Sequence, residues 1–322
     1  MRLVKLATYL LISAQRPAIP LTVAQGLGIT AESFSRRIWK SAALTMKRQS
    51  LDHRTTTLMD AMLETARQVP DRGVTIYDRR GQNPQTRTYR DFPEMIKSAA
   101  SRLQTAGVGP GDRVLICLPT CWELIEIWLG AVYRGAHPVL VAPAGALGGA
   151  AAHAHKLAGL IEFLTPRRFV CDEATRKQLQ DFGAPQAAAI SMTPSEFNAL
   201  QPAAGEVLHK AAPSDIAFMQ LTSGSTGRQR AVMIRHSSII HNSQAMRHFN
   251  KIEPYDEGEA VVSWLPLNHD MGLVGCLLFT LVGGYNLWLL RPDSFLARPR
   301  LWMQVLSHSK ATMSAGPNSS TG

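Results

Sequence analysis

One loop of this sequence combines the residue types that hold phosphate groups. The run LTSGSTGRQR, residues 221–230, contains five consecutive hydroxyl or glycine residues, Ser223 to Gly227, followed by arginines at 228 and 230. Glycine lets the backbone approach a ligand closely, and successive N–H groups and hydroxyls can bind anionic oxygens. A following arginine can balance the charge through two parallel hydrogen bonds. By composition alone a flexible linker is the commoner explanation, and the GxxxxGK[ST] spacing of P-loop NTPases is absent.

His269 is a second candidate for chemistry, in the run NHDMG at residues 268–272. A single histidine that follows a strand is more often a solvated or hydrogen-bonded side chain than a catalytic one. The cysteines at 117, 121, 171 and 276 lack the spacing of a metal site and are predicted to be buried thiols of a cytoplasmic protein.

The elements that position these residues follow an α/β pattern. Continuous apolar runs at 113–118, 137–142 and 168–171 are predicted strands, and helical patterns at 121–134 and 147–164 separate them. Strand–helix–strand units favour a mostly parallel sheet with helices on both faces. The loop at 221–230 is then predicted to connect a strand at 215–223 to a helix at 236–249. Residues 172–213 are polar and proline-rich and are predicted to form a surface excursion.

The pattern changes near Thr57. Thr57 and Asp60 match a capping box at the start of a helical stripe, whereas residues 1–50 are basic and show little periodicity. We predict a basic N-terminal extension at 1–50 and a domain at 51–322. Deletion of residues 1–45 is expected to leave the thermal stability nearly unchanged.

The last third of the chain alternates predicted strands and helices. The strands are expected at 259–267, 286–290 and 311–317, and the helices at 271–282 and 297–308. Residues 271–290 carry no charge, but Gly283, Gly284 and Asn286 interrupt them, so a buried helix followed by a buried strand is favoured over a membrane span.

Composition excludes several classes of function. The 322 residues are 45% hydrophobic, which is enough for a substantial core. The net charge of +10 comes from scattered lysines and arginines without a long basic run, so no nucleic-acid partner is expected. The apolar run at 6–14 imitates a signal-peptide core but lacks a persuasive cleavage site. A cytoplasmic location is expected.

Three ordered segments resemble the adenylate-forming (AMP-binding) superfamily, most closely its fatty acyl-AMP ligases and long-chain acyl-CoA synthetases. The run at 221–239 is similar to the phosphate-binding signature of that superfamily. The run SWLPLNHDMGLVG at 263–275 is similar to the segment beside its nucleotide and acyl sites, and residues 295–318 resemble the helix, strand and turn that lead to its adenine loop. The opening of such domains is similar to residues 88–143.

The resemblance implies ATP-dependent activation of a fatty acid, or another carboxylic acid, to acyl-AMP, with transfer to CoA or to a carrier-protein thiol. ATP and Mg²⁺ are the implied cofactors. His269 is the implied catalytic residue, facing the acyl-adenylate, with Asp270 orienting its ring or the following turn. The implied nucleotide-binding residues are Thr222, Ser223, Gly224, Ser225, Thr226, Gly227, Arg230, Gly316, Pro317 and Asn318.

Two departures from the family pattern affect this expectation. Arg230 stands where the family usually carries lysine, and Gln229 and Ala231 replace the usual proline and glycine. The family's Mg²⁺ ligand, its ribose-binding aspartate and its C-terminal lobe with a catalytic lysine would all lie beyond Gly322. The expected fold is therefore an incomplete N-terminal domain, and the chain alone is not expected to turn over ATP. The alternative is an inactive remnant, or half of a split enzyme whose missing part is a separate chain.

Overall fold

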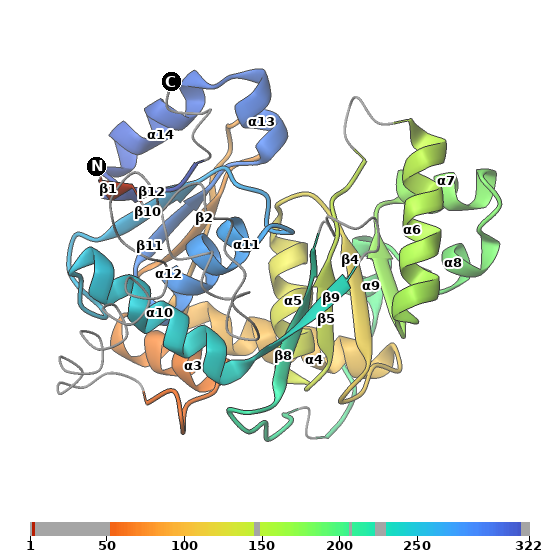
Figure 1. Cartoon of the computed structure of the whole chain (residues 1–322), viewed down its shortest axis with the longest axis horizontal. Helices are drawn as coiled ribbons and strands as arrows, with labels where there is room; N and C mark the ends of the chain where they lie inside the picture. The colour runs from red at the N-terminus through yellow and green to blue at the C-terminus, as the bar shows by residue number, and fades with distance from the viewer. Residues whose placement is uncertain (1, 4–51, 145–148, 206–207, 223–229, 317–322) are drawn as a thin grey trace, which may run out of the picture.

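The computed structural model describes residues 2–3, 52–144, 149–205, 208–222 and 230–316, which form two six-stranded sheets (Figure 1). In the first, sheet A, neighbouring strands are parallel except for the pair β2 and β3. Its strands, in spatial order, are β1 (Arg2–Leu3), β12 (Met313–Ser314), β10 (Ala260–Ser263), β11 (Asn286–Leu289), β2 (Gly73–Ile76) and β3 (Gln85–Thr88).

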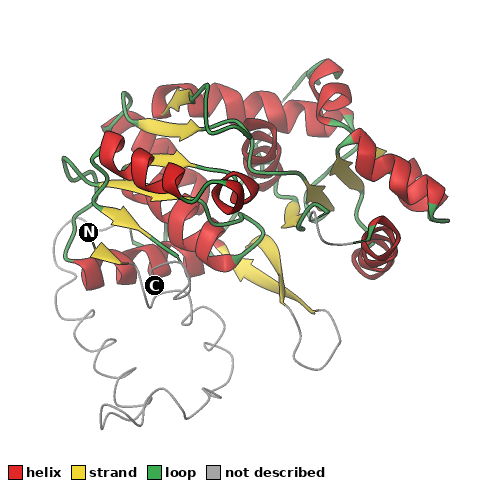
Figure 2. Ribbon diagram, turned by 90° about the horizontal axis from the view of Figure 1, so that it is seen from above, coloured by secondary structure: helices red, strands yellow, loops and turns green. Residues whose placement is uncertain are grey.

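The second sheet, sheet B, is parallel except at one edge, where β8 and β9 form an antiparallel pair. Its strands, in spatial order, are β7 (Ser191–Met192), β6 (Arg168–Cys171), β4 (Arg113–Cys117), β5 (His137–Leu140), β8 (Ile216–Thr222) and β9 (Arg230–Arg235). Figure 2 shows the two sheets from above, with sheet A on the left and sheet B on the right.

Helices surround and separate the sheets. Their bounds are α3 (Leu58–Gln68), η1 (Tyr89–Asp91), α4 (Phe92–Thr105), α5 (Trp122–Tyr133), α6 (Ala150–Leu164), α7 (Glu173–Asp181), α8 (Pro185–Ala189), α9 (Pro194–Ala199), α10 (His236–Asn250), α11 (Asp270–Gly272), the π-helical η2 (Leu273–Leu278), α12 (Phe279–Gly283), α13 (Pro292–Ala297) and α14 (Arg300–Ser309).

Strand β4 explains why the predicted layers form. Val114 and Ile116 point into the large core that includes α4 and α5, whereas Leu115 and Cys117 point into a second core beneath α6, α7 and α8. Because successive side chains of a strand face opposite sides, a continuous apolar run needs cover on both faces. The predicted α/β architecture with helices on both faces of a mostly parallel sheet is confirmed.

Most predicted elements are present. Thr57 and Asp60 form the predicted capping box at the start of α3. The uncharged stretch forms a buried helical segment from α11 to α12 followed by β11, also as predicted. No helix among the described residues combines the length and the apolar character that a membrane span requires. The four cysteines form no disulfide, and three of them are buried while Cys121 is half-buried.

Residues 172–213, which were predicted to form a surface excursion, contain the regular elements α7, α8, β7 and α9. One prediction about the elements was wrong. The glycine-rich loop does not lead directly into a helix, because strand β9 comes first, at 230–235. Val232 and Ile234 favour a strand there, and pairing with β8 satisfies its backbone.

The predicted N-terminal extension falls almost entirely outside the described residues. Of it, the structure describes Arg2–Leu3, which pair with Met313 and Ser314 of β12. The boundary at residue 50 and the effect of deleting residues 1–45 stay predictions.

Candidate functional site

The predicted phosphate loop connects two paired strands of sheet B. Thr222 ends β8, Arg230 begins β9, and these two residues are register partners across the hairpin. Thr222 is half-buried, whereas Arg230 is exposed at the foot of the loop. Both ends of the loop are thus fixed by the sheet. Ser223, Gly224, Ser225, Thr226 and Gly227 lie outside the described residues.

His269 lies in a tight turn between β10 and α11. Its backbone N–H donates to the carbonyl of Pro266 at 3.1 Å, and its own carbonyl accepts from Leu273 at 2.9 Å. Gly272 packs against the same turn, where an added Cβ would lie 2.3 Å from the Pro266 oxygen. In this structure the absence of a side chain at Gly272 therefore permits the close contact between two backbone segments.

Asp270 fixes the orientation of the His269 ring. The Nδ1 atom of His269 lies 2.7 Å from Asp270 Oδ1, which also accepts the Met271 N–H at 2.8 Å. Met271 N is 3.3 Å from the same Nδ1, but an Nδ1 that donates to a carboxylate cannot accept, so we assign the proton to Nδ1. The His269 side chain is 62% exposed, which leaves the rest of the ring open to a ligand.

The same carboxylate raises the pKa of His269 above its ordinary value, although partial burial opposes the change. Asp270→Asn should therefore lower the pKa of His269, as measured by NMR titration of its ring protons. Asp256→Asn removes an equal charge from the loop before β10 and should leave that pKa unchanged. Equal His269 titrations in the wild type and in Asp270→Asn would contradict the assigned hydrogen bond.

The residues before Gly316 are held by a short hydrogen-bonded chain. The Trp302 indole N–H donates to Ser314 Oγ at 3.0 Å, and Ser314 Oγ donates to the Val262 carbonyl at 2.7 Å. Trp264 stacks on Phe295 with ring centroids 3.8 Å apart, so its indole ring packs against neighbouring side chains. Gly316, two residues after the end of β12, is half-buried, whereas Pro317 and Asn318 lie outside the described residues.

Sheet topology brings His269 and Gly316 to a common edge. Strands β10 and β12 are adjacent and parallel, so the segments that follow their carboxyl ends leave sheet A on the same side. Figure 1 places α11, directly after His269, in the middle of the molecule between the strands of sheet A and β8. Ligands of open α/β sheets bind at this kind of edge.

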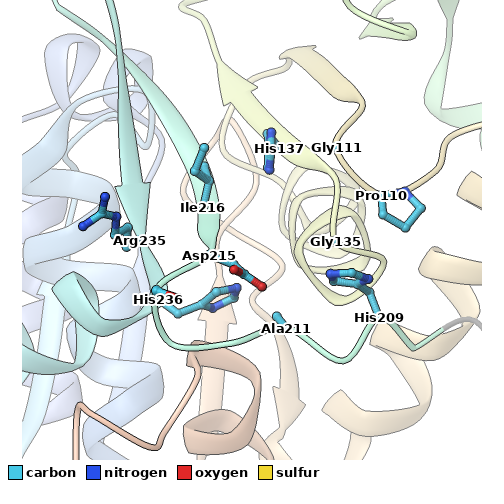
Figure 3. A pocket seen from close by; sticks show the side chains of 11 residues that line it. Pro110, Gly111, Gly135, His137, His209, Ala211, Asp215, Ile216, Arg235 and His236 are labelled. Carbon is cyan, nitrogen blue, oxygen red and sulfur yellow. The ribbon is translucent and has the colours of Figure 1, made fainter.

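A pocket of about 570 Å³ lies at the end of sheet B where β5 and β8 begin, opposite to the end that carries the β8–β9 loop (Figure 3). We call it the basal pocket. Its lining includes His137 at the start of β5, His209, Asp215 before β8, and Arg235 and His236 at the end of β9 and start of α10. Strand β8 begins at the pocket and ends at Thr222, six residues further along, which corresponds to about 20 Å of extended chain. Sequence reasoning missed the basal pocket, because its histidines are 27 or more positions apart.

A comparison with protein families identifies the chain. The model of the AMP-binding enzyme family matches residues 62–320. The chain belongs to the AMP-binding enzyme family. This confirms the resemblance, and the match spans all three motif segments: the β8–β9 hairpin, the turn with His269 and the end of β12.

The relatives within the AMP-binding family include acyl-AMP ligases. A long-chain-fatty-acid–AMP ligase, FadD26 of Mycobacterium marinum, is 35% identical over 230 residues, which are 68% of this chain and 37% of the relative. A putative acyl-CoA synthetase of Caulobacter vibrioides is 28% identical over 246 residues, 76% of this chain and 42% of the relative.

Solved structures agree with the AMP-binding fold. A fatty acyl-adenylate ligase structure from a study of the Escherichia coli and Legionella pneumophila enzymes has a TM-score of 0.75 and 29% identity, covering 84% of this chain and 48% of that one. The L. pneumophila ligase in complex with acyl adenylate and pyrophosphate has a TM-score of 0.66 and 28% identity, covering 82% and 44%. The chain spans less than half the length of these relatives.

Proposed function

We propose that this chain forms the phosphate-binding and adenine-binding part of an enzyme that activates a fatty acid, or another carboxylic acid, with ATP to give acyl-AMP. The acyl group would pass to CoA or to a carrier-protein thiol, in the cytoplasm. The observation that carries this proposal is the family match over residues 62–320, which includes the three motif segments in their expected order. Relatives named as fatty-acid–AMP ligases support the substrate class.

In this proposal the hairpin holds the phosphates of ATP. Thr222 to Gly227 would supply hydroxyls and backbone N–H groups, and Arg230 would supply a fixed positive charge at the foot of the loop. The β8–β9 pairing supports this role, because it holds both ends of the loop in place before a ligand arrives. ATP would bring Mg²⁺, which supplies further charge compensation on the phosphates when bound. The described residues contain no cluster of His, Cys, Asp or Glu that could hold a metal by itself.

His269 would contact the anionic part of the acyl-adenylate. A histidine whose pKa is raised carries more positive charge near neutral pH, which suits stabilisation of charge that develops during transfer of the adenylyl group. Gly316, Pro317 and Asn318 would lie against adenine. The place of Gly316 at the same edge of sheet A as His269 supports this assignment.

The activity itself is tested by fatty-acid-dependent exchange of labelled pyrophosphate into ATP. The assay compares this chain alone with this chain mixed with the separately produced C-terminal part of an acyl-AMP ligase relative. We propose that the chain needs such a part, so exchange is expected only in the mixture. No exchange in either sample would contradict an enzymatic role for this chain and favour a role in binding alone.

ATP binding by the hairpin is tested at Arg230. Arg230→Ala should weaken ATP binding by about ten-fold, because a hydrogen bond to a charged group contributes roughly 1.5–3 kcal/mol. Arg230→Lys, which restores the residue that the family usually carries, should keep or improve the affinity. Isothermal titration calorimetry at one salt concentration measures all three proteins, since ionic screening would blur the comparison.

The matched control is Lys156→Ala, which removes one positive charge from an exposed position of α6. It should leave ATP affinity unchanged. If Arg230→Ala and Lys156→Ala both bind ATP like the wild type, the hairpin is a connection between strands and not a phosphate site.

A further inference from the structure

The basal pocket brings together side chains from three separate segments of sheet B and its surroundings. His137 begins β5, His236 begins α10, and His209 comes from the connection that leads to β8. Figure 3 shows the three imidazoles arranged around one space, with Asp215 beside His236 and the Arg235 side chain directed away. At about 570 Å³ the pocket falls within the size range of small-ligand sites.

Backbone hydrogen bonds hold the connection that carries His209 in place. The His209 N–H donates to the Tyr133 carbonyl at 3.1 Å, and the Asp215 carbonyl accepts the His236 N–H at 3.1 Å. The His209 ring packs on Gly135, where an added Cβ would lie 2.5 Å from it. The pocket wall is therefore formed before any ligand binds, which lowers the entropic cost of binding.

Three imidazoles line the pocket, and Arg113 adds positive charge beside His137. The negative charges of Asp215 and Asp60 oppose them and raise the pKa of His236, although burial outweighs this effect. Both carboxylates also have partners in the protein: Asp215 Oδ2 accepts the Ala212 N–H at 2.8 Å, and Asp60 belongs to the capping box of α3. Burial and mutual repulsion lower the pKa values of His137 and His236, with His209 contributing to both changes. An anion among the three rings would relieve that repulsion and favour their protonation.

We propose that the basal pocket is a second ligand site, which binds a small phosphate-type oxyanion through His137, His209 and His236 and takes up protons as it does so. This site lies at the end of sheet B where β5 and β8 begin, away from the β8–β9 loop, and it goes beyond the proposed adenylation function. His236 can contribute through Nε2, because its Nδ1 accepts the Leu58 N–H at 3.2 Å. Proton uptake on binding makes affinity for the anion increase as the pH falls.

The test is an NMR titration of the full 322-residue chain with inorganic phosphate, at constant ionic strength maintained with chloride and at about pH 6.5, near the ordinary pKa of histidine. The ring resonances of His137 and His209 should move towards their protonated positions as phosphate saturates the site. Glycerol phosphate, titrated in parallel, distinguishes a free anion from a phosphate group on a larger molecule, and binding of either at these rings supports the site.

Variants locate the bound phosphate. His209→Gln should weaken phosphate binding by about ten-fold, since it removes one charge-assisted hydrogen bond. His248→Gln, at an exposed position of α10, and Arg230→Gln, at the hairpin, should leave the affinity at the basal pocket unchanged. His137→Gln provides a second variant if His209→Gln does not fold.

Two results would overturn the proposal. In the first, the wild-type imidazole resonances respond to phosphate no more than to chloride. In the second, Arg230→Gln abolishes the response while His209→Gln preserves it, which would place the anion at the hairpin. The adenylation proposal has a separate test, because pyrophosphate exchange is independent of the histidine resonances.

Discussion

Gly272→Ala is expected to lower the free energy of unfolding by about 2–3 kcal/mol, as overpacked buried sites do. The new Cβ would lie 2.3 Å from the Pro266 oxygen, 2.9 Å from the Pro266 carbonyl carbon and 3.1 Å from the Leu265 oxygen. All three atoms belong to the backbone, so no side chain can rotate away to make room. Urea unfolding followed by circular dichroism measures the change.

The control for this substitution is Gly159→Ala. Gly159 is exposed in the middle of α6, and nothing lies within 4 Å of its added Cβ. Alanine stabilises helix interiors relative to glycine by roughly 0.5–1 kcal/mol, so this variant should become slightly more stable. If Gly272→Ala were as stable as the wild type, the close contact between α11 and the Leu265–Pro266 backbone would be wrong.

Gly272→Ala also tests what holds the His269 side chain in position. The Pro266 oxygen that the new Cβ would displace accepts the backbone N–H of His269. Moving this oxygen should therefore shift the His269 ring resonance and loosen its contact with Asp270. Gly159→Ala should leave that resonance unchanged. A variant with a normal His269 resonance but lower stability would confine the effect to packing.

His236 is expected to make the stability of the chain depend on pH. Burial is the main cause that lowers its pKa from 6.5 to about 4, and its Nδ1 accepts the N–H of Leu58 at the first turn of α3. The unfolded chain therefore binds a proton at this residue more readily than the folded chain does. The stabilisation is complete above about pH 6.5 and is lost as the pH falls towards 4. At 1.36 kcal/mol per pH unit, this contribution reaches about 3 kcal/mol.

His236→Asn isolates that contribution. The asparagine Oδ1 can accept the Leu58 N–H in place of Nδ1, but asparagine does not titrate. Between about pH 7.5 and about pH 4.5 the wild type should lose roughly 2–3 kcal/mol more stability than the variant, as measured by urea unfolding without phosphate. Parallel loss of stability in the two proteins would show that His236 is not buried as a neutral side chain.

The sequence by itself determined the elements that depend on neighbouring residues. The capping box at Thr57, the apolar strand runs and the uncharged stretch at 271–290 all lie within short windows, where side-chain periodicity and capping decide the local structure. The three motif segments could also be recognised, since each consists of consecutive residues. The family match at 62–320 confirmed that assignment.

Only the tertiary structure decided the features that join distant residues. Strand β9 was missed because its six residues gain their hydrogen bonds from β8 rather than from their own sequence. The role of Gly272 depends on the backbone of Leu265 and Pro266, and that of His236 on a helix that begins 178 positions earlier. The basal pocket depends on three segments that meet only when sheet B forms. Such contacts are set by chain topology and burial, which no local pattern encodes.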